Sequence, residues 1–302
     1  MKDKWLLDDQ IRHNKRATVR LFVVLFVILW ALVFVAGYFF LGSILITGVF
    51  ALVFGLVYLW IASSWSVEAV LKATRARPAD PQKREERLLL HRVEEMAIAA
   101  GLPMPKVYVQ DDDDINAFAT GRKPEEGIIC VSSAALEQLD QEELQGVIAH
   151  EMSHIRNYDI RISTYAVALI GIIAMLAEIM IRAMFWGGAR GGGKSSGAAW
   201  AIMAVVAIVL VILAPILSRL TYLAISRKRE YLADASGAEL SRNPDGLARA
   251  LAKISGQEPT PHRMDRTVAS LYLANPFKRV RKQSLWATHP PIDDRIERLR
   301  RM

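Results

Sequence analysis

The stretch Ala149-His150-Glu151-Met152-Ser153-His154-Ile155 carries an H-E-x-x-H pattern. At about 3.6 residues per turn, the two histidines project from neighbouring points on one helix face, where both imidazoles can reach a single zinc ion. Glu151 stands beside the first histidine, in the position of a base that takes a proton from water on the metal. The stretch therefore predicts metal-assisted hydrolysis of a peptide bond, with further zinc ligands supplied by the rest of the chain.

The residues around this pattern favour a helix. Asp140 followed by Glu143 reads as a capping box at the helix start. An apolar stripe continues at helical spacing through Leu144, Ile148, Met152 and Ile155. The histidines lie about 130° away from that stripe at 100° per residue. Without other ligands, the alternative interpretation is a pair of core or surface histidines with no metal.

Composition places the chain in a membrane. Of its 302 residues 52% are hydrophobic, and they cluster in long uncharged runs. The single cysteine, Cys130, excludes an internal disulfide and a cysteine-rich zinc site, so the ligands must be histidines and carboxylates. The net charge is +7, and the basic residues flank the hydrophobic runs. Lipid headgroups, rather than nucleic acid, are the expected partners of these charges. The sequence does not indicate an oligomeric state.

The hydrophobic runs divide the chain into five segments. Residues 1–20 form a basic N-terminus that the positive-inside rule places in the cytoplasm. Residues 21–67 are about twice as long as one span needs, which predicts two transmembrane helices with a turn near Gly42-Ser43. Residues 162–217 predict a second transmembrane pair, with a Gly-rich outer loop at 187–197. The N-terminus, the segment 68–161 between the two helix pairs and the segment 218–302 after the second pair then lie on the cytoplasmic side.

Two soluble segments, 68–161 and 218–302, are the halves of one cytoplasmic domain split by the second transmembrane pair. The first half predicts a helix over 81–100 and strands over 106–110, 115–120 and 127–131. Two helices are predicted to follow, and the second holds the H-E-x-x-H pattern. Helices together with a small sheet indicate an α+β fold. The predicted fold class is thus mostly helical α+β, with four transmembrane helices and a split zincin-like metalloprotease domain.

Glu230 and Asp234 are four residues apart in a helical stretch, so they point the same way. The spacing alone fits either a metal-binding pair or surface carboxylates that balance the basic run 227–229.

Four pieces of sequence carry a resemblance to a known family. They are Asn116-Ala117-Phe118-Ala119, His150-Glu151-Met152-Ser153-His154 with Asn157 and Asp159 after it, Ser226-Arg227-Lys228-Arg229-Glu230-Tyr231-Leu232-Ala233-Asp234, and His289-Pro290-Pro291 followed by Arg295. With these pieces in this order, the chain resembles the HtpX group of membrane zinc metallopeptidases, relatives of the type-I CaaX prenyl proteases, over nearly its whole length.

The resemblance implies roles for several residues. Glu230 is expected to be the third ligand of one Zn²⁺ ion per chain, and Asp234 a carboxylate that orients a ligand histidine. His289 and Arg295 are expected to line the site and to stabilise the oxyanion of the tetrahedral intermediate. Asn116, Ala117, Phe118 and Ala119 are expected to form an edge strand to which an extended peptide adds through backbone hydrogen bonds.

The resemblance also implies a function. We expect a stress-response protease of the plasma (inner) membrane that cleaves misfolded or damaged membrane proteins on the cytoplasmic side. Two alternatives are a processing protease of lipidated C-termini and a catalytically silent membrane scaffold. Four hydrophobic segments are few for the large intramembrane chamber of the prenyl proteases, which argues against the first. An intact Glu151 with a full ligand set argues against the second.

Overall fold

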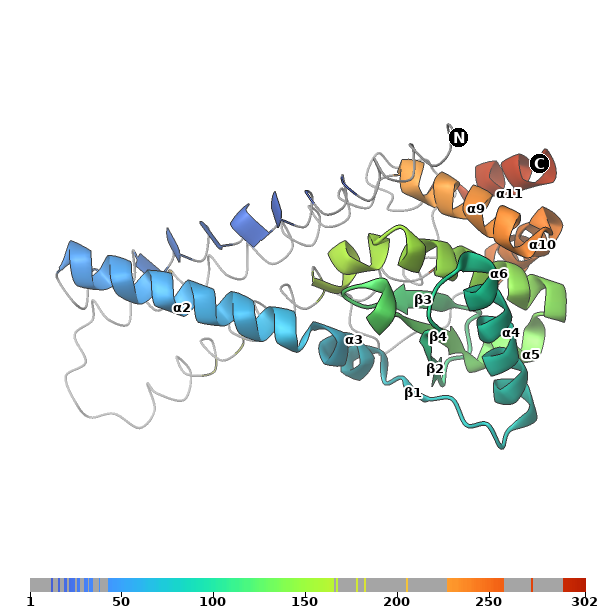
Figure 1. The fold of residues 1–302 in the computed structure, drawn as a ribbon, viewed down its shortest axis with the longest axis horizontal. Coiled ribbons are helices and arrows are strands. Elements are labelled where there is room, and N and C mark those ends of the chain that lie inside the picture. Colours follow the sequence, from blue (N-terminus) through green and yellow to red (C-terminus); the bar gives the residue numbers. More distant parts are fainter. Residues whose placement is uncertain are drawn as a thin grey trace.

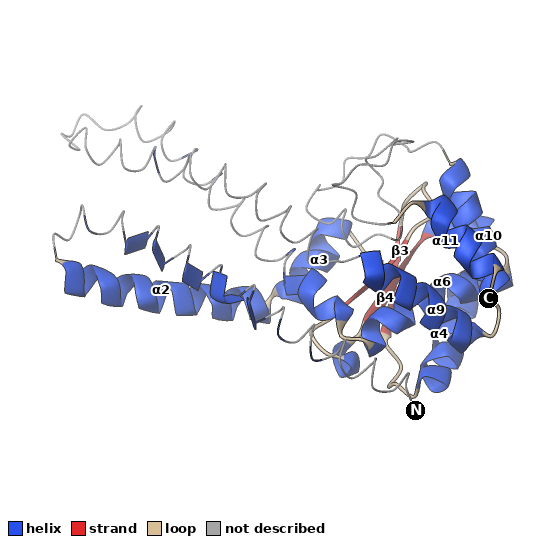
Figure 2. Cartoon of the chain, turned by 90° about the horizontal axis from the view of Figure 1, so that it is seen from above, coloured by secondary structure: helices blue, strands red, loops and turns tan. Residues whose placement is uncertain are grey.

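The computed structural model of the chain describes residues 43–165, 227–257 and 290–302, together with isolated residues elsewhere. In these parts a four-stranded sheet is packed among helices, and one long helix extends away from this body (Figures 1 and 2). The described parts are mostly helical with one small sheet, as the predicted fold class requires. The predicted N-terminus 1–20, the first helix of the first pair, most of 162–217 and the Gly-rich loop fall largely outside the described residues.

Helix α2 (Ile44–Ser64) is the second helix of the predicted hairpin. It begins after Ser43, whose hydroxyl accepts a hydrogen bond from the Ile46 N–H, at the position predicted for the turn. An 18-residue stretch of α2 has a mean hydropathy of 2.5, and large side chains face outward, with Leu45 77% and Trp60 69% exposed. Within the described ranges, α2 is the one helix long and apolar enough to cross a membrane.

The chain bends at Trp65 and continues as α3 (Ser66–Thr74), so the domain boundary predicted at residue 68 falls inside this helix. Arg75 ends α3 in the left-handed conformation. Strand β1 (Arg77–Pro78) follows, which the sequence did not predict. A two-residue strand containing proline has no alternation to detect, and proline restricts it to a sheet edge.

Helix α4 (Arg84–Ala100) confirms the predicted helix except for its first turn, and Gly101 ends it with a positive φ. Its buried Glu86 accepts two hydrogen bonds from the Arg77 guanidinium, at 2.8 and 2.9 Å, and one from the Asp80 N–H at 2.6 Å. The Arg77 hydrogen bonds outweigh burial and lower the pKa of Glu86 to about 2. This ion pair joins β1 to the start of α4.

The sheet has the strand order β1-β2-β4-β3, formed by β1, β2 (Lys106–Gln110), β4 (Ile128–Ser132) and β3 (Ala117–Thr120). β2 runs parallel to β4, whereas β1 and β3 run antiparallel to their neighbours. β3 therefore lies at an edge, as predicted. It starts at residue 117 rather than 115, and β4 starts one residue later than predicted, after the 3-10 turn η1 (Pro124–Glu126).

Two helices follow the sheet, α5 (Ser133–Gln138) and α6 (Gln141–Arg156). The predicted capping box is present at the start of α6. The Asp140 carboxylate accepts from the N–H groups of Glu142 and Glu143, and the Glu143 carboxylate accepts from the Asp140 N–H at 2.8 Å. The box satisfies donors that would otherwise be unpaired in the first turn, so it fixes where the H-E-x-x-H helix begins.

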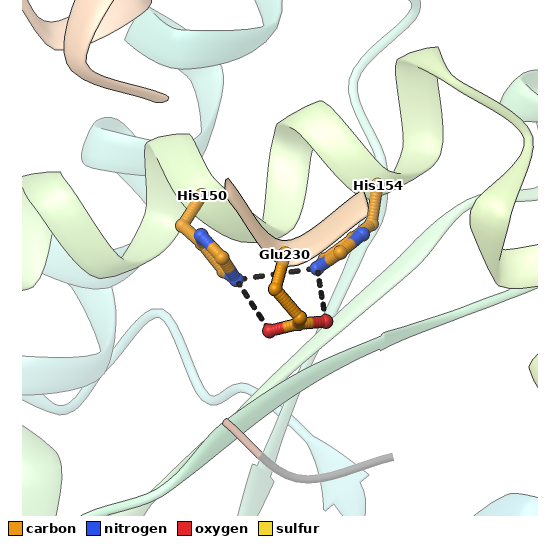
Figure 3. Close-up of side chains that lie close together, drawn as sticks. All are labelled: His150, His154 and Glu230. Atoms are coloured by element: carbon orange, nitrogen blue, oxygen red, sulfur yellow. Dashed lines mark hydrogen bonds and ion pairs between the residues drawn. The ribbon is translucent and has the colours of Figure 1, made fainter. Parts of the chain in front are cut away.

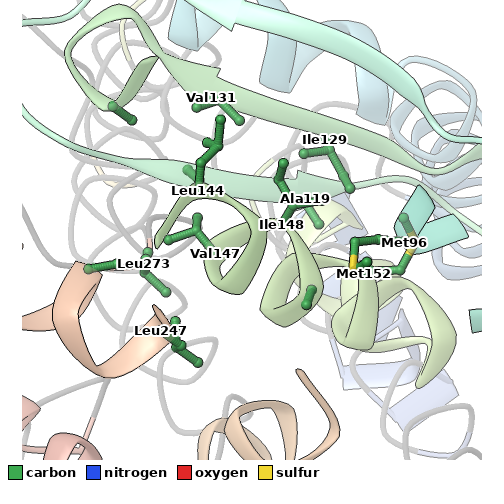
Figure 4. Packing of buried hydrophobic residues seen from close by; sticks show 14 of the residues in the cluster. Met96, Ala119, Ile129, Val131, Leu144, Val147, Ile148, Met152, Leu247 and Leu273 are labelled. Carbon is green, nitrogen blue, oxygen red and sulfur yellow. The ribbon is translucent and has the colours of Figure 1, made fainter. Parts of the chain in front are cut away.

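Helix α6 lies at the centre of the core, against the sheet on one side and later helices on the other (Figure 4). The predicted stripe is buried: Ile148 and Met152 belong to the same cluster as Ile129 and Ala119 of the sheet. Burying such side chains contributes about 1.5–3 kcal/mol each relative to exposure. The stripe therefore fixes the rotation of α6, and with it the direction of both histidines.

The remaining described helices are α9 (Arg227–Ser241), α10 (Pro244–Gly256) and α11 (Ile292–Arg300). α9 and α10 pack against α6, and α11 packs against both of them. At Gly237 of α9, an added Cβ would lie 3.0 Å from the His150 backbone nitrogen. The absence of a side chain there lets α9 approach α6 closely beside the first histidine of the pattern.

Candidate metal centre

The three predicted ligands meet in one buried cluster. His150 and His154 point from α6 towards Glu230 of α9 (Figure 3). The Nε2 atoms of the two histidines are 3.2 Å apart. The Glu230 carboxylate oxygens lie 3.9 Å from Nε2 of His150 and 3.7 Å from Nε2 of His154. Two histidines four residues apart on α6 and a glutamate on α9 thus bring three candidate ligand atoms together.

These separations fit a metal ion. Tetrahedral coordination at about 2.0–2.1 Å from the metal places ligand atoms about 3.3 Å apart. The donor set, two imidazole nitrogens and a carboxylate oxygen, has neither a cysteine nor a lysine that would compete for the centre. The residues present therefore fit a metal with three protein ligands, a set that leaves a further position open for water or substrate.

The other nitrogen of each histidine faces a carboxylate. Nδ1 of His150 lies 3.0 Å from Oδ1 of Asp234, and Nδ1 of His154 lies 3.0 Å from Oδ2 of Asp159. An ionised carboxylate can only accept, so it favours a proton on Nδ1 and leaves the lone pair on Nε2. Both lone pairs then point at each other and at Glu230. Three converging electron-pair donors repel one another unless a proton or a metal ion lies between them.

Glu151 is buried next to this cluster, with 3% of its surface exposed. Burial raises the pKa of its carboxyl, since removal from water disfavours the charged form. A base whose pKa is moved towards neutrality can take a proton and give it back during one reaction cycle. The structure thus places the predicted base beside the ligand atoms.

Arg295 lies behind the cluster. It is fully buried, and its guanidinium donates to both oxygens of Asp234, at 2.9 and 2.7 Å. A third nitrogen lies 3.7 Å from Glu230. Despite burial, the Arg295 charge lowers the pKa of Asp234 to about 2. With its guanidinium bound to Asp234, Arg295 positions the carboxylates that hold the histidines. Its expected contact with the substrate stays a prediction.

The predicted peptide-binding edge is partly occupied by the chain itself. The Asn116 C=O accepts from the Ser132 N–H of β4, so by antiparallel alternation Ala117 and Ala119 direct their backbone groups away from β4. The Ala117 N–H donates to the Asn116 side chain at 3.0 Å, and the Ala117 C=O accepts from the Leu273 N–H at 3.0 Å. Among the four predicted residues, only Ala119 has an outward-facing N–H and C=O that make no hydrogen bond with the described residues.

The other two predicted edge residues have structural contacts. Phe118 packs on the opposite face of the sheet with Cys130, Val70 and Val167. Asn116 is buried, and its N–H donates to the Ser132 hydroxyl at 2.9 Å. His289, the predicted oxyanion partner, lies outside the described residues.

Sequence reasoning missed two residues beside the centre, Asp159 and Arg229. Arg229 Nη1 lies 3.3 Å from Oδ1 of Asp159, whose other oxygen contacts His154. Asp159 is five residues after His154, a spacing that gives no helical signal. Both residues do lie in the pieces of sequence that carry the family resemblance, and this was the one available sign that they belong to the site.

We expect metal binding to release a proton from His154 at pH 7. Burial alone lowers the pKa of His154, but the hydrogen bond with Asp159 and the negative charges of Glu230 and Glu151 raise it to about 9. Below that pH the imidazole holds a second proton, which a metal must displace, so zinc affinity falls by about tenfold per pH unit as the pH drops. Calorimetric titration of stripped protein with zinc, in buffers of different ionisation enthalpy, measures the release. A heat that does not depend on the buffer would contradict the assignment.

Comparison with known proteins agrees with the geometry. Residues 83–302 match the profile of Peptidase family M48. Three relatives named "Protease HtpX homolog" align over 98% of this chain and 100% of their own length: those of Streptococcus uberis (44% identical over 299 residues), Ligilactobacillus salivarius (45%) and Listeria monocytogenes (43%). The crystal structure of S. mikatae Ste24p covers 80% of this chain and 58% of that one, at 18% identity and a TM-score of 0.42. The chain belongs to peptidase family M48, among the HtpX proteases, and is a metallopeptidase.

Proposed function

We propose that this chain is a zinc endopeptidase of the plasma membrane that cleaves misfolded or damaged membrane proteins on the cytoplasmic side. The observation that carries the proposal is the convergence of His150, His154 and Glu230 beside the buried base Glu151. This centre belongs to a domain that only the short helix α3 separates from the apolar helix α2. The site is therefore tied closely to a segment suited to the bilayer.

Zinc is the metal that this donor set favours. Two neutral imidazoles and one carboxylate form a borderline-soft site with an open position, which is typical of hydrolytic zinc. When bound, the ion lowers the pKa of water to about 7 and polarises the scissile carbonyl. Glu151 removes the proton from that water at its carboxylate and then delivers it to the leaving amine. Asp234 and Asp159 hold the imidazole rings in place throughout.

The substrate binds as an extended strand against β3. We assign the pairing to the N–H and C=O of Ala119, because the corresponding groups of Ala117 already bond to Asn116 and Leu273. Backbone pairing reads no side chain, so it selects chains that are already unfolded rather than a particular sequence. Such selection suits removal of damaged proteins better than processing of one defined C-terminus.

The membrane arrangement follows from charge. The basic residues of 1–20 precede the first hydrophobic run, and Lys72, Arg75 and Arg77 follow α2. Positive charge at both ends of the first helix pair places both ends in the cytoplasm, and the second pair, within 162–217, returns the chain there. Four transmembrane helices and a cytoplasmic catalytic domain in two parts, 68–161 and 218–302, result.

Labelling of single introduced cysteines tests this topology. Cys130 is buried and adds no background. In intact cells, a membrane-impermeant maleimide should label a cysteine at Gly192 in the Gly-rich loop. It should label one at Ser255, exposed on α10 of the catalytic domain, only after the cells are opened. Equal labelling of both sites in intact cells would rule out the four-helix topology.

Proteolysis in reconstituted vesicles tests the activity. The substrate is a membrane protein with a destabilised cytoplasmic domain, compared with its stably folded form and with a lipidated C-terminal peptide. We expect cleavage of the destabilised form alone, loss of cleavage after chelation and recovery with zinc. Cleavage of only the lipidated peptide would instead support a processing enzyme. No cleavage of any substrate by zinc-loaded protein would support a silent scaffold.

A further inference from the structure

The two ligand histidines have matching carboxylate supports, of which the resemblance implies only Asp234. His150 faces Asp234, which Arg295 holds, and His154 faces Asp159, whose other oxygen faces Arg229. We propose that Asp159 is the positioning residue for His154, and that its contact with Arg229 makes the metal geometry depend on how the start of α9 docks against α6. This inference rests on the proposed zinc site.

A break in the helix brings Asp159 to His154. Residues five apart on a continuous α-helix point about 140° apart and cannot touch. Here α6 ends at Arg156, and Tyr158 adopts a left-handed φ of 60° before helical geometry resumes at Asp159. A left-handed tyrosine is uncommon, since the conformation costs of order 1–3 kcal/mol and persists only where surrounding contacts impose it. This turn brings the Asp159 carboxylate to Nδ1 of the His154 imidazole.

Arg229 lies against the buried carboxylate of Asp159. Asp159 and Arg229 are each only 5% exposed, and a buried carboxylate is costly unless a cation or hydrogen bonds compensate it. Oδ2 of Asp159 contacts His154 at 3.0 Å, while Oδ1 lies 3.3 Å from the Arg229 guanidinium. With Nδ1 of His154 held at the Asp159 carboxylate, the Nε2 atom of the same ring faces the metal position.

The position of this pair in the chain gives it a second consequence. Asp159 comes just before the hydrophobic runs of 162–217 and Arg229 comes after them, 70 residues later. Arg229 also directly precedes the ligand Glu230. One contact therefore joins the place where the chain leaves the catalytic domain to the place where it returns, and it aligns His154 of the first half with Glu230 of the second.

The test uses zinc affinity and a cobalt spectrum, with the full-length protein in detergent. Asp159→Asn keeps the shape of the side chain but loses the charge, and Arg229→Gln removes the cation. Loss of a partner to a ligand histidine typically weakens metal binding by about 10–100-fold, and we expect both variants to fall in that range in competition with a chelating dye. With Co²⁺ in place of zinc, their visible absorption bands should shift, because those bands report ligand geometry.

Arg249→Gln is the matched control. Arg249 forms ion pairs with Glu142 and Asp245 at the surface of the same helix packing, so its loss should leave zinc affinity and the cobalt spectrum unchanged. If Asp159→Asn does not fold, Asp159→Glu and Arg229→Lys keep the charges with altered reach, and they should still shift the cobalt bands. Wild-type affinity and spectrum in all folded variants at Asp159 and Arg229 would overturn this inference while leaving the zinc site intact. Failure of the wild-type chain itself to bind zinc would instead overturn the proposed function.

Discussion

Replacement of Glu151 by Gln should lower the rate of peptide hydrolysis by about 10²–10⁴ and leave the bound metal in place. Glutamine has nearly the same shape as glutamate, and the ligand set His150, His154 and Glu230 is unchanged. The amide cannot accept the proton of the attacking water or return it to the leaving amine. Because Glu151 is buried, a carboxylate dissolved in the solvent cannot reach its position and act as the base.

The measurement is the cleavage rate of an unfolded substrate at equal zinc content. Glu142→Gln is the control, since Glu142 is an exposed carboxylate in the first turn of the same helix. The control should cleave at the wild-type rate. A Glu151→Gln variant that cleaved at the wild-type rate, in a preparation free of host proteases, would show that Glu151 is not the base.

Replacement of Glu230 by Gln should remove most of the metal. The anionic ligand is lost, and the remaining imidazoles, 3.2 Å apart at Nε2, supply only two donors. The buried Arg295, 3.7 Å from the Glu230 carboxylate, would also lose part of its charge compensation. We expect zinc affinity to fall by more than the factor of about 10–100 that is typical when a partner behind a ligand is lost.

Competition with a chelator of known affinity measures this loss. The control is Glu239→Gln, which changes an exposed carboxylate on the same helix α9 and should bind zinc as the wild type does. Metal-free samples of both variants are compared by circular dichroism, so that loss of the fold is distinguished from loss of a ligand. A folded Glu230→Gln protein with undiminished zinc affinity would remove Glu230 from the ligand set.

Local sequence signals were sufficient for the helix at the centre of the site. The Asp140–Glu143 box, the buried stripe and the two histidines all lie within α6, so each could be inferred from neighbours a few residues apart. β2 was predicted with its observed bounds for the same reason. Glu230 needed the resemblance, because helical spacing alone could not distinguish a ligand from a surface carboxylate.

Contacts between distant parts of the chain were beyond such signals. The Leu273 N–H donates to the Ala117 C=O at the sheet edge, which is why we propose Ala119 as the residue that pairs with a peptide. Arg229 meets Asp159 across 70 residues, and Asp159 reaches His154 only because the helix breaks at Tyr158. Neither pairing has a periodicity, and the left-handed tyrosine has no sequence signature. Burial of Arg295 against Asp234 likewise depends on where α11 packs.

X-ray absorption at the zinc edge of the purified protein tests the central claim most directly. If His150, His154 and Glu230 hold one catalytic zinc, the spectrum shows two imidazole nitrogens and oxygen ligands at about 2.0–2.2 Å, with no sulfur. The Glu151→Gln variant should give the same protein shell, whereas Glu230→Gln should not. A shell without imidazole scattering, or one that contains the longer zinc–sulfur distance of about 2.3 Å, would contradict the account.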